Sequence, residues 1–71
     1  MVYRRIRDLR EDNDLTQSKV AAYLNITQRA YSRYETGERS IPVEVLSALA
    51  DYYETSVDYL INRTDEKSKY P

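Results

Sequence analysis

Hydrophobic residues recur at helical spacing along almost the whole chain, and no convincing run of four or more alternates with polar residues. The clearest case is Leu46, Leu49, Ala50 and Tyr53, which fall at positions i, i+3, i+4 and i+7. Shorter pieces of this pattern occur in residues 6–9, 20–24, 31–34 and 57–61. Because residues three or four apart share one face of a helix, the pattern predicts an all-α fold of five helices.

Residues that favour helix ends lie between these segments. Thr16, Thr27 and Ser56 each precede a periodic run, where a side-chain oxygen can accept a backbone N–H of the first turn. Pro42 suits the first turn of the fourth helix. Residues that favour turns or tolerate a left-handed backbone are expected to end the other helices, at Asp12-Asn13-Asp14, Asn25, Gly37 and Asn62.

These signals predict one small domain over residues 1–63. Residues 64–71, TDEKSKYP, carry almost no apolar content and are expected to form a flexible tail. The predicted core consists of the apolar residues on the inner helix faces: Ile6, Leu9, Leu15, Val20, Ala21, Leu24, Ile26, Leu46, Leu49, Tyr53, Val57 and Leu60.

Composition narrows the possible chemistry. The chain has no cysteine and no histidine, so it has no disulfide and lacks the commonest zinc ligands and the commonest general base. Carboxylates such as Asp51 and Asp58 come with no nucleophile–base pair or phosphate-binding loop, so an enzyme is not expected, nor is a metal or another cofactor. The chain has neither a signal peptide pattern nor a membrane-length apolar run, so we expect a cytoplasmic protein with no membrane partner.

Charge is distributed unevenly along the chain. The net charge is −1, but residues 1–40 hold eight basic and six acidic residues, whereas residues 41–71 hold three basic and six acidic ones. A polyanionic partner requires one basic face and not a basic protein. The asymmetry is compatible with such a face and equally with an ordinary mixed-charge surface.

The segment from Gln17 to Thr36 has the pattern of two short helices crossing at a steep angle. A small residue, Ala21, permits close approach, and Asn25 suits the turn between the helices. The inner faces carry apolar or aromatic residues: Val20, Leu24, Ile26, Tyr31 and Tyr34. Together these positions indicate a helix-turn-helix unit.

Residues 4–62 resemble the Cro/C1-type helix-turn-helix transcriptional regulators, the phage-repressor-like XRE family. LTQSKVAAYLNITQRAYSRYETGER resembles the family's second and third helices, and IPVEVLSALADYYETSVDYL resembles its last two. The family often has Gly in place of Asn25 and aliphatic residues in place of Tyr31 and Tyr34. The resemblance implies a compact five-helix, lambda-repressor-like fold and sequence-specific binding of double-stranded DNA by a small transcriptional regulator, with repression as the expected mode of action.

In this family the third helix enters the major groove and its N-terminal residues meet base edges. Since Tyr31 and Tyr34 are expected to face the core, the residues facing away are the candidates for base contact: Gln28, Arg29, Ser32 and Arg33. Gln pairs well with adenine and Arg with guanine. The alternative is that these four residues form an ordinary solvated helix face without a DNA contact.

The resemblance also implies further roles. Thr16 and Gln17 at the start of the second helix, with Arg39 and Ser40 after the third, are expected to contact DNA phosphates. Arg10 and Glu35 match a pair that forms a structural salt bridge in relatives. For the three arginines in residues 4–7, nearby phosphates and simple solvation both remain open.

A palindromic operator requires two copies of a domain this small. The expected homodimer patch lies on the last two helices, at Tyr52, Thr55, Val57, Tyr59 and Ile61, with Thr55 and Tyr59 near the two-fold axis. We expect a monomer or weak dimer in solution and no small-molecule ligand. The competing hypothesis is an antitoxin-like or anti-repressor module that uses this same surface to bind another protein.

Overall fold

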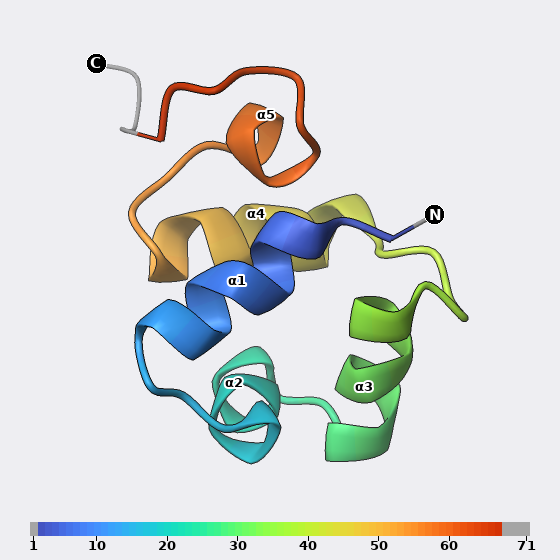
Figure 1. The fold of residues 1–71 in the computed structure, drawn as a ribbon. Helices are drawn as coiled ribbons and strands as arrows, with labels where there is room; N and C mark the ends of the chain where they lie inside the picture. The colour runs from blue at the N-terminus through green and yellow to red at the C-terminus, as the bar shows by residue number, and fades with distance from the viewer. Residues whose placement is uncertain (1, 68–71) are drawn as a thin grey trace.

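The computed structural model describes residues 2–67 and contains five α-helices and no strand within them (Figure 1). The predicted all-α fold is therefore confirmed. The helices are α1 (Arg4–Asp12), α2 (Gln17–Leu24), α3 (Gln28–Thr36), α4 (Val43–Tyr52) and α5 (Val57–Leu60). None of them is long and apolar enough to cross a lipid bilayer.

Local chemistry fixes the helix ends as the sequence predicted. The side-chain oxygen of Thr16 accepts the backbone N–H of Lys19 at 3.2 Å, and that of Thr27 accepts the N–H of Ala30 at 3.1 Å. Ser56 caps α5 in the same way. The residues that follow α2 and α3 have positive φ, 59° at Asn25 and 83° at Gly37. Asp14, in the turn predicted after α1, and Asn62, expected to end α5, also have positive φ, whereas Glu54 is a left-handed residue that was not predicted.

The core lies where all five helices meet. Its fully enclosed apolar residues are Ile6, Leu9, Val20, Ala21, Tyr31, Leu46, Leu49, Ala50 and Leu60. Seven of the twelve predicted core residues are buried in it, and the other five are half-buried and pack against it: Leu15, Leu24, Ile26, Tyr53 and Val57. Tyr31, with no exposed surface, and Ala50 were missing from that list.

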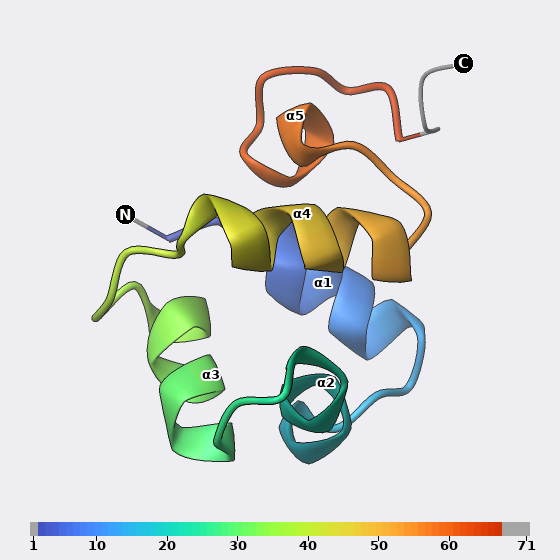
Figure 2. The ribbon, with the colours of Figure 1, turned by 180° about the vertical axis from the view of Figure 1, so that it is seen from behind.

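The elements are arranged along one axis of the molecule. In both views, α2 and α3 form one end, α5 forms the other, and α1 and α4 lie between them (Figures 1 and 2). Contacts between α1 and α3, and between α2 and α4, hold the helix-turn-helix end against the rest of the domain. The outer face of α3 therefore lies far from the C-terminal end of the described chain.

The first part of the predicted tail makes contacts with the folded domain. Its first four residues, 64–67, fold back beside α5 (Figure 1), and residues 68–71 lie outside the described chain. Arg5 of α1 holds this segment: its Nη1 donates to the Thr64 carbonyl at 2.6 Å and its Nη2 lies 2.7 Å from an Asp65 carboxylate oxygen. Thr55 donates its hydroxyl to the carbonyl of Lys67. These contacts come from residues distant in sequence, which the low apolar content of the segment does not reveal.

Candidate nucleic-acid interface

The inner face of α3 fixes which of its side chains face solvent. Tyr31 is fully buried and Glu35 retains only 8% exposure. The opposite face carries the recognition row, which we define as Gln28, Arg29, Ser32 and Arg33. Gln28 and Arg29 are exposed, and Ser32 and Arg33 are half-buried. The four residues predicted for base contact thus share one surface.

The recognition row lines an open hollow together with residues of neighbouring segments. This recognition hollow has a volume of about 540 Å³, and Gln17 of α2 and Glu38 after α3 complete its lining. Ser18 of α2 donates to the side-chain oxygen of Gln28 at 2.7 Å, so the first reading side chain is tied to the neighbouring helix. Ser18 and Glu38 were not among the predicted site residues.

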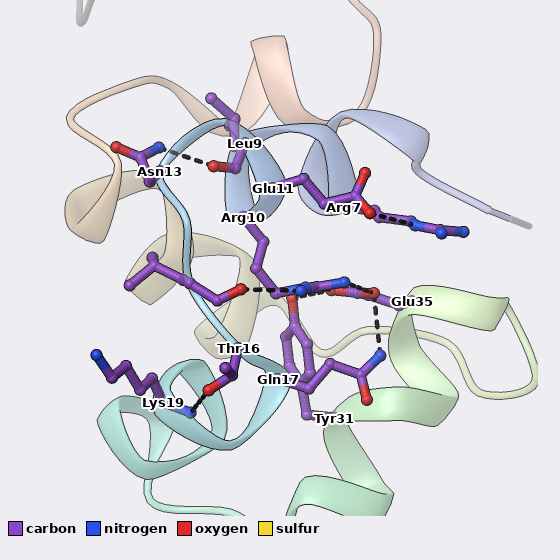
Figure 3. Close-up of polar contacts among 11 residues, drawn as sticks. Arg7, Leu9, Arg10, Glu11, Asn13, Thr16, Gln17, Lys19, Tyr31 and Glu35 are labelled. Carbon is purple, nitrogen blue, oxygen red and sulfur yellow. Dashed lines mark hydrogen bonds and ion pairs between the residues drawn. The ribbon is translucent and has the colours of Figure 1, made fainter.

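A buried polar cluster beneath this surface joins three helices (Figure 3). Arg10 of α1 meets Glu35 of α3 through two contacts, Nε to Oε2 at 2.7 Å and Nη2 to Oε1 at 3.3 Å. Gln17 of α2 donates to Glu35 Oε1 at 3.2 Å, and the Tyr31 hydroxyl donates to Glu35 Oε2. The ion pair expected between Arg10 and Glu35 is therefore present, with two donors that were not predicted.

The electrostatics of this cluster favour the ionised carboxylate. Burial by itself opposes ionisation of Glu35, but hydrogen bonds from Arg10, Tyr31 and Gln17 outweigh it and lower the pKa of Glu35. Burial, followed by the hydrogen bond to Glu35, raises the pKa of the Tyr31 hydroxyl. The cluster stays charged and connected near neutral pH, so it holds the start of α2 and the face of α3 in one fixed relation.

The four residues predicted to contact phosphates come from the start of α2 and from the connection that follows α3. Gln17 opens α2, although its amide group already binds Glu35, and the Thr16 side-chain oxygen caps the same helix. Arg39 and Ser40 are exposed in the connection that follows α3. All four positions thus flank the surface formed by α3.

The arginines of α1 divide into two groups. Arg5 faces the C-terminal segment, where it also lies 4.2 Å from the centre of the Tyr59 ring. Arg4 and Arg7 line a second hollow, with Arg10, Gln17 and other residues, on the helix-turn-helix side. Their spacing of three was visible in the sequence, but it does not by itself reveal which side of α1 faces α3.

The predicted dimer patch requires one correction. Thr55 is fully buried, because the chain around residue 67 covers it, so it cannot lie on a surface near a two-fold axis in this conformation. The other four members are half-buried: Tyr52, Val57, Tyr59 and Ile61. Tyr52 packs against the exposed Tyr23, with 4.2 Å between ring centres.

Two capped helices joined through a left-handed residue, with a polar outer face on the second, define a helix-turn-helix domain. Comparison with known proteins agrees, since the helix-turn-helix family model HTH_3 matches residues 6–60. The chain belongs to this family of Cro/C1-type helix-turn-helix proteins, as the sequence resemblance indicated.

Individual relatives are regulators and repressors by name. The chain is 35% identical over 66 residues to an uncharacterized HTH-type transcriptional regulator, YobD of Bacillus subtilis, which covers 93% of this chain and 59% of the relative. It is 35% identical over 69 residues to the cryptic phage CTXphi transcriptional repressor RstR of Vibrio cholerae, covering 92% of this chain and 62% of that one. The chain thus spans about 60% of the length of these curated relatives.

A solved structure has the same fold. It is the crystal structure of the P22 c2 repressor protein in complex with the synthetic operator 9T. The match has a TM-score of 0.79 and 26% sequence identity, and covers 90% of this chain and 98% of the repressor chain.

Proposed function

We propose that this chain is the sequence-specific DNA-binding domain of a transcriptional regulator, with repression as its mode of action. The observation that carries the proposal is the recognition row on α3, a set of long hydrogen-bonding side chains on a helix fixed from below by the Arg10–Glu35 pair. The similarity to a repressor crystallised with its operator and to a named phage repressor supports it.

Each member of the recognition row has a suitable chemical role. The amide of Gln28 can donate to N7 and accept from N6 of adenine, and the guanidinium of Arg29 can donate to both O6 and N7 of guanine. Arg33 is longer than Ser32 and reaches either a base or the backbone. Because the side-chain oxygen of Gln28 has a second lone pair, it can keep its hydrogen bond from Ser18 while it contacts a base.

The flanking residues position the domain on the backbone. In the proposed complex, Thr16 and Gln17 present the start of α2, with its free backbone N–H groups, to a phosphate. Arg39 and Ser40, in the connection that follows α3, also contact the phosphate backbone. Such contacts contribute affinity and orientation but carry no direct sequence information.

We further propose that two copies bind a palindromic duplex, with their α3 helices one helical turn, about 34–36 Å, apart. Four reading side chains cover too few base pairs to define a unique site. The remaining patch of Tyr52, Val57, Tyr59 and Ile61 is small and half-buried, so its interface falls below the roughly 1,200 Å² of stable complexes. Sedimentation should show a monomer or weak dimer alone, and a two-to-one complex on a palindromic duplex.

Selection of bound sequences from random duplexes, at a fixed and stated salt concentration, tests the proposed function. A consensus with two symmetric halves is the expected result. Recovery of sequences without any base preference would contradict the proposed DNA reading. It would favour the alternative, in which the α4–α5 end binds another protein.

A further inference from the structure

Three arginines of α1 share the face that is turned toward α3. Arg4, Arg7 and Arg10 lie three residues apart, whereas Arg5 lies on another face and binds the C-terminal segment. Figure 3 shows Arg10 extending to Glu35 of α3, and Arg7 beside Glu11 one turn earlier on α1. The start of α1 therefore places positive charge beside the helix that carries the recognition row.

These arginines line a hollow of about 480 Å³, here called the arginine hollow. Gln17, Glu35 and Thr36 form its other polar walls. Glu35 is its single acidic residue, and that carboxylate is buried and paired with Arg10. The charges that remain open to solvent in the hollow are those of Arg4 and Arg7.

Neither arginine is used to stabilise the fold. Arg4 is exposed, and no acceptor for its side chain exists among residues 2–67. Arg7 has a side chain that is 63% exposed, and its one ion pair is a 3.4 Å contact with Glu11 one helical turn away. Exposed pairs of this kind contribute little to stability, so Arg7 can exchange Glu11 for a stronger anionic partner.

The position of the two arginines is electrostatically unfavourable in the isolated protein. Both lie in or next to the first turn of α1, which contains no acidic residue. A helix N-terminus carries a partial positive charge, so cations there are repelled and an anion is attracted. An oxyanion held between them would satisfy the two guanidinium groups and the helix end together.

The arginine hollow also continues the recognition hollow. Gln17 lines both, and Thr36 follows the recognition row on α3 by one turn from Ser32 and Arg33. A DNA strand lying along α3 would therefore reach the start of α1 as its backbone leaves the groove. The two hollows form one track across the helix-turn-helix side of the molecule.

We propose that Arg4 and Arg7 form a phosphate-binding site for the backbone of the DNA whose bases α3 reads, an inference that rests on the proposed function. Arg4 and Arg7 donate N–H groups to non-bridging phosphate oxygens, and Arg7 releases Glu11 as it does so. The planar guanidinium fork matches a phosphate with two parallel hydrogen bonds, which a lysine cannot provide. This site extends the DNA interface from α2 and α3 to α1.

The test compares three single variants of the whole chain on one selected duplex: Arg4→Gln, Arg7→Gln and, as the control, Arg63→Gln. Each removes one positive charge. Arg63 is exposed, makes no side-chain ion pair in the described chain, and follows α5 at the end of the molecule remote from α3. The binding constant is measured over a range of salt concentrations, and circular dichroism checks that each variant is folded.

Loss of one phosphate contact should make the slope of log K against log salt shallower by about 0.9. We expect this change for Arg4→Gln and for Arg7→Gln, with base preference kept, and no change for Arg63→Gln. If the two α1 variants behave like Arg63→Gln while the wild-type chain still selects a consensus, the inference fails and the proposed function stands. A wild-type chain without base preference would instead refute the proposed function, whatever the slopes.

Free phosphate is the other source of the same oxyanion. Titration of the DNA-free chain with inorganic phosphate, followed by the amide signals of residues 4–7 in NMR spectra, separates the two sources. Weak binding that does not saturate supports a site built for a polyanion. Tight, saturable binding that Arg4→Gln abolishes would reveal a dedicated site for the free ion and overturn the assignment to the DNA backbone.

Discussion

Tyr31 and Tyr53 both place a hydroxyl group inside the protein, one at the helix-turn-helix end and one at the end of α4. The Tyr31 hydroxyl donates to Glu35 within the cluster formed with Arg10 and Gln17. The Tyr53 hydroxyl is buried and has no hydrogen-bond partner among the described residues. Burial raises the pKa of Tyr53 to about 12, so this group is buried in its neutral form.

The hydrogen-bonded position of the Tyr31 hydroxyl is consistent with the function proposed for α3. A reading helix needs a fixed position, because its side chains must meet base edges within hydrogen-bond distance. Directional contacts from α1, α2 and α3 to one carboxylate supply that position. The Tyr53 ring instead packs against the apolar core, which fills space without the same directional constraint.

The largest expected effect comes from removing the centre of the polar cluster. Glu35→Ala leaves the guanidinium of Arg10, with a side chain only 13% exposed, and the hydroxyl of Tyr31 without their acceptor. Breaking a buried pair in this way costs about 3–5 kcal/mol. Urea unfolding should show a loss of this size, and DNA affinity should fall with it; a loss below about 1 kcal/mol would show that the cluster does not organise this end.

The same carboxylate predicts a pH dependence of stability. The pKa of Glu35 is lowered in the folded protein from its ordinary value of 4.5, so the folded state binds this proton less readily than the unfolded state. Its contribution is therefore fully present above pH 4.5 and disappears as the pH falls through the lowered value. Unfolding measured from pH 7 downward should show a steeper loss for the native chain than for Glu35→Gln, which carries no ionisable group there. Parallel curves would contradict the prediction.

The two tyrosines provide a matched pair of variants. Tyr31→Phe removes a hydrogen bond to a charged acceptor, which is worth about 1.5–3 kcal/mol. Tyr53→Phe removes a buried hydroxyl without a partner, so stability should stay within about 0.5 kcal/mol or increase. Thermal and urea unfolding of both variants measures the contrast. Equal losses in the free energy of unfolding would show that the hydrogen bond from Tyr31 to Glu35 adds nothing to stability.

A smaller effect is expected at the opposite end. Arg5→Ala removes the contacts to Thr64 and Asp65 and the packing on the Tyr59 ring. Since Asp65 is almost fully exposed, the loss of stability should be about 1 kcal/mol. Trypsin should cleave after Arg63 or Lys67 faster than in the native chain, while affinity for DNA stays the same. Unchanged cleavage would argue that Arg5 does not retain the segment.

These two ends also differ in how far the sequence predicted them. The turns and helix starts were predictable because each depends on a few adjacent residues, such as Thr27 ahead of α3 and Asn25 in a left-handed backbone. The partnership of Arg10 with Glu35, 25 residues apart, was predictable only through the resemblance to a family. The hydrogen bonds that Gln17 and Tyr31 donate to Glu35 depend on how three helices meet, so no local sequence pattern predicts them.

At the C-terminal end, the local pattern was misleading. Thr55 is a polar residue between two short helices, a place that usually faces solvent, yet it has no exposed surface. Residues 64–67 are polar, and their sequence did not indicate that Thr64 and Asp65 would contact Arg5, about 60 residues earlier in the chain. Contacts between the two ends of a chain do not produce a periodic sequence pattern in either segment, so the sequence does not reveal them.

Sequence selection repeated with variants of Gln28, Arg29 and Arg39 tests directly whether α3 reads bases while the residues around it bind phosphates. Gln28→Ala and Arg29→Ala should each cost about 1–3 kcal/mol on the selected duplex and relax the preference at particular positions of each half-site. Arg39→Ala should weaken binding to all sequences alike and make the salt slope shallower by about one unit. If Gln28→Ala and Arg29→Ala leave both the affinity and the selected consensus unchanged, α3 is not the reading helix and the account is wrong.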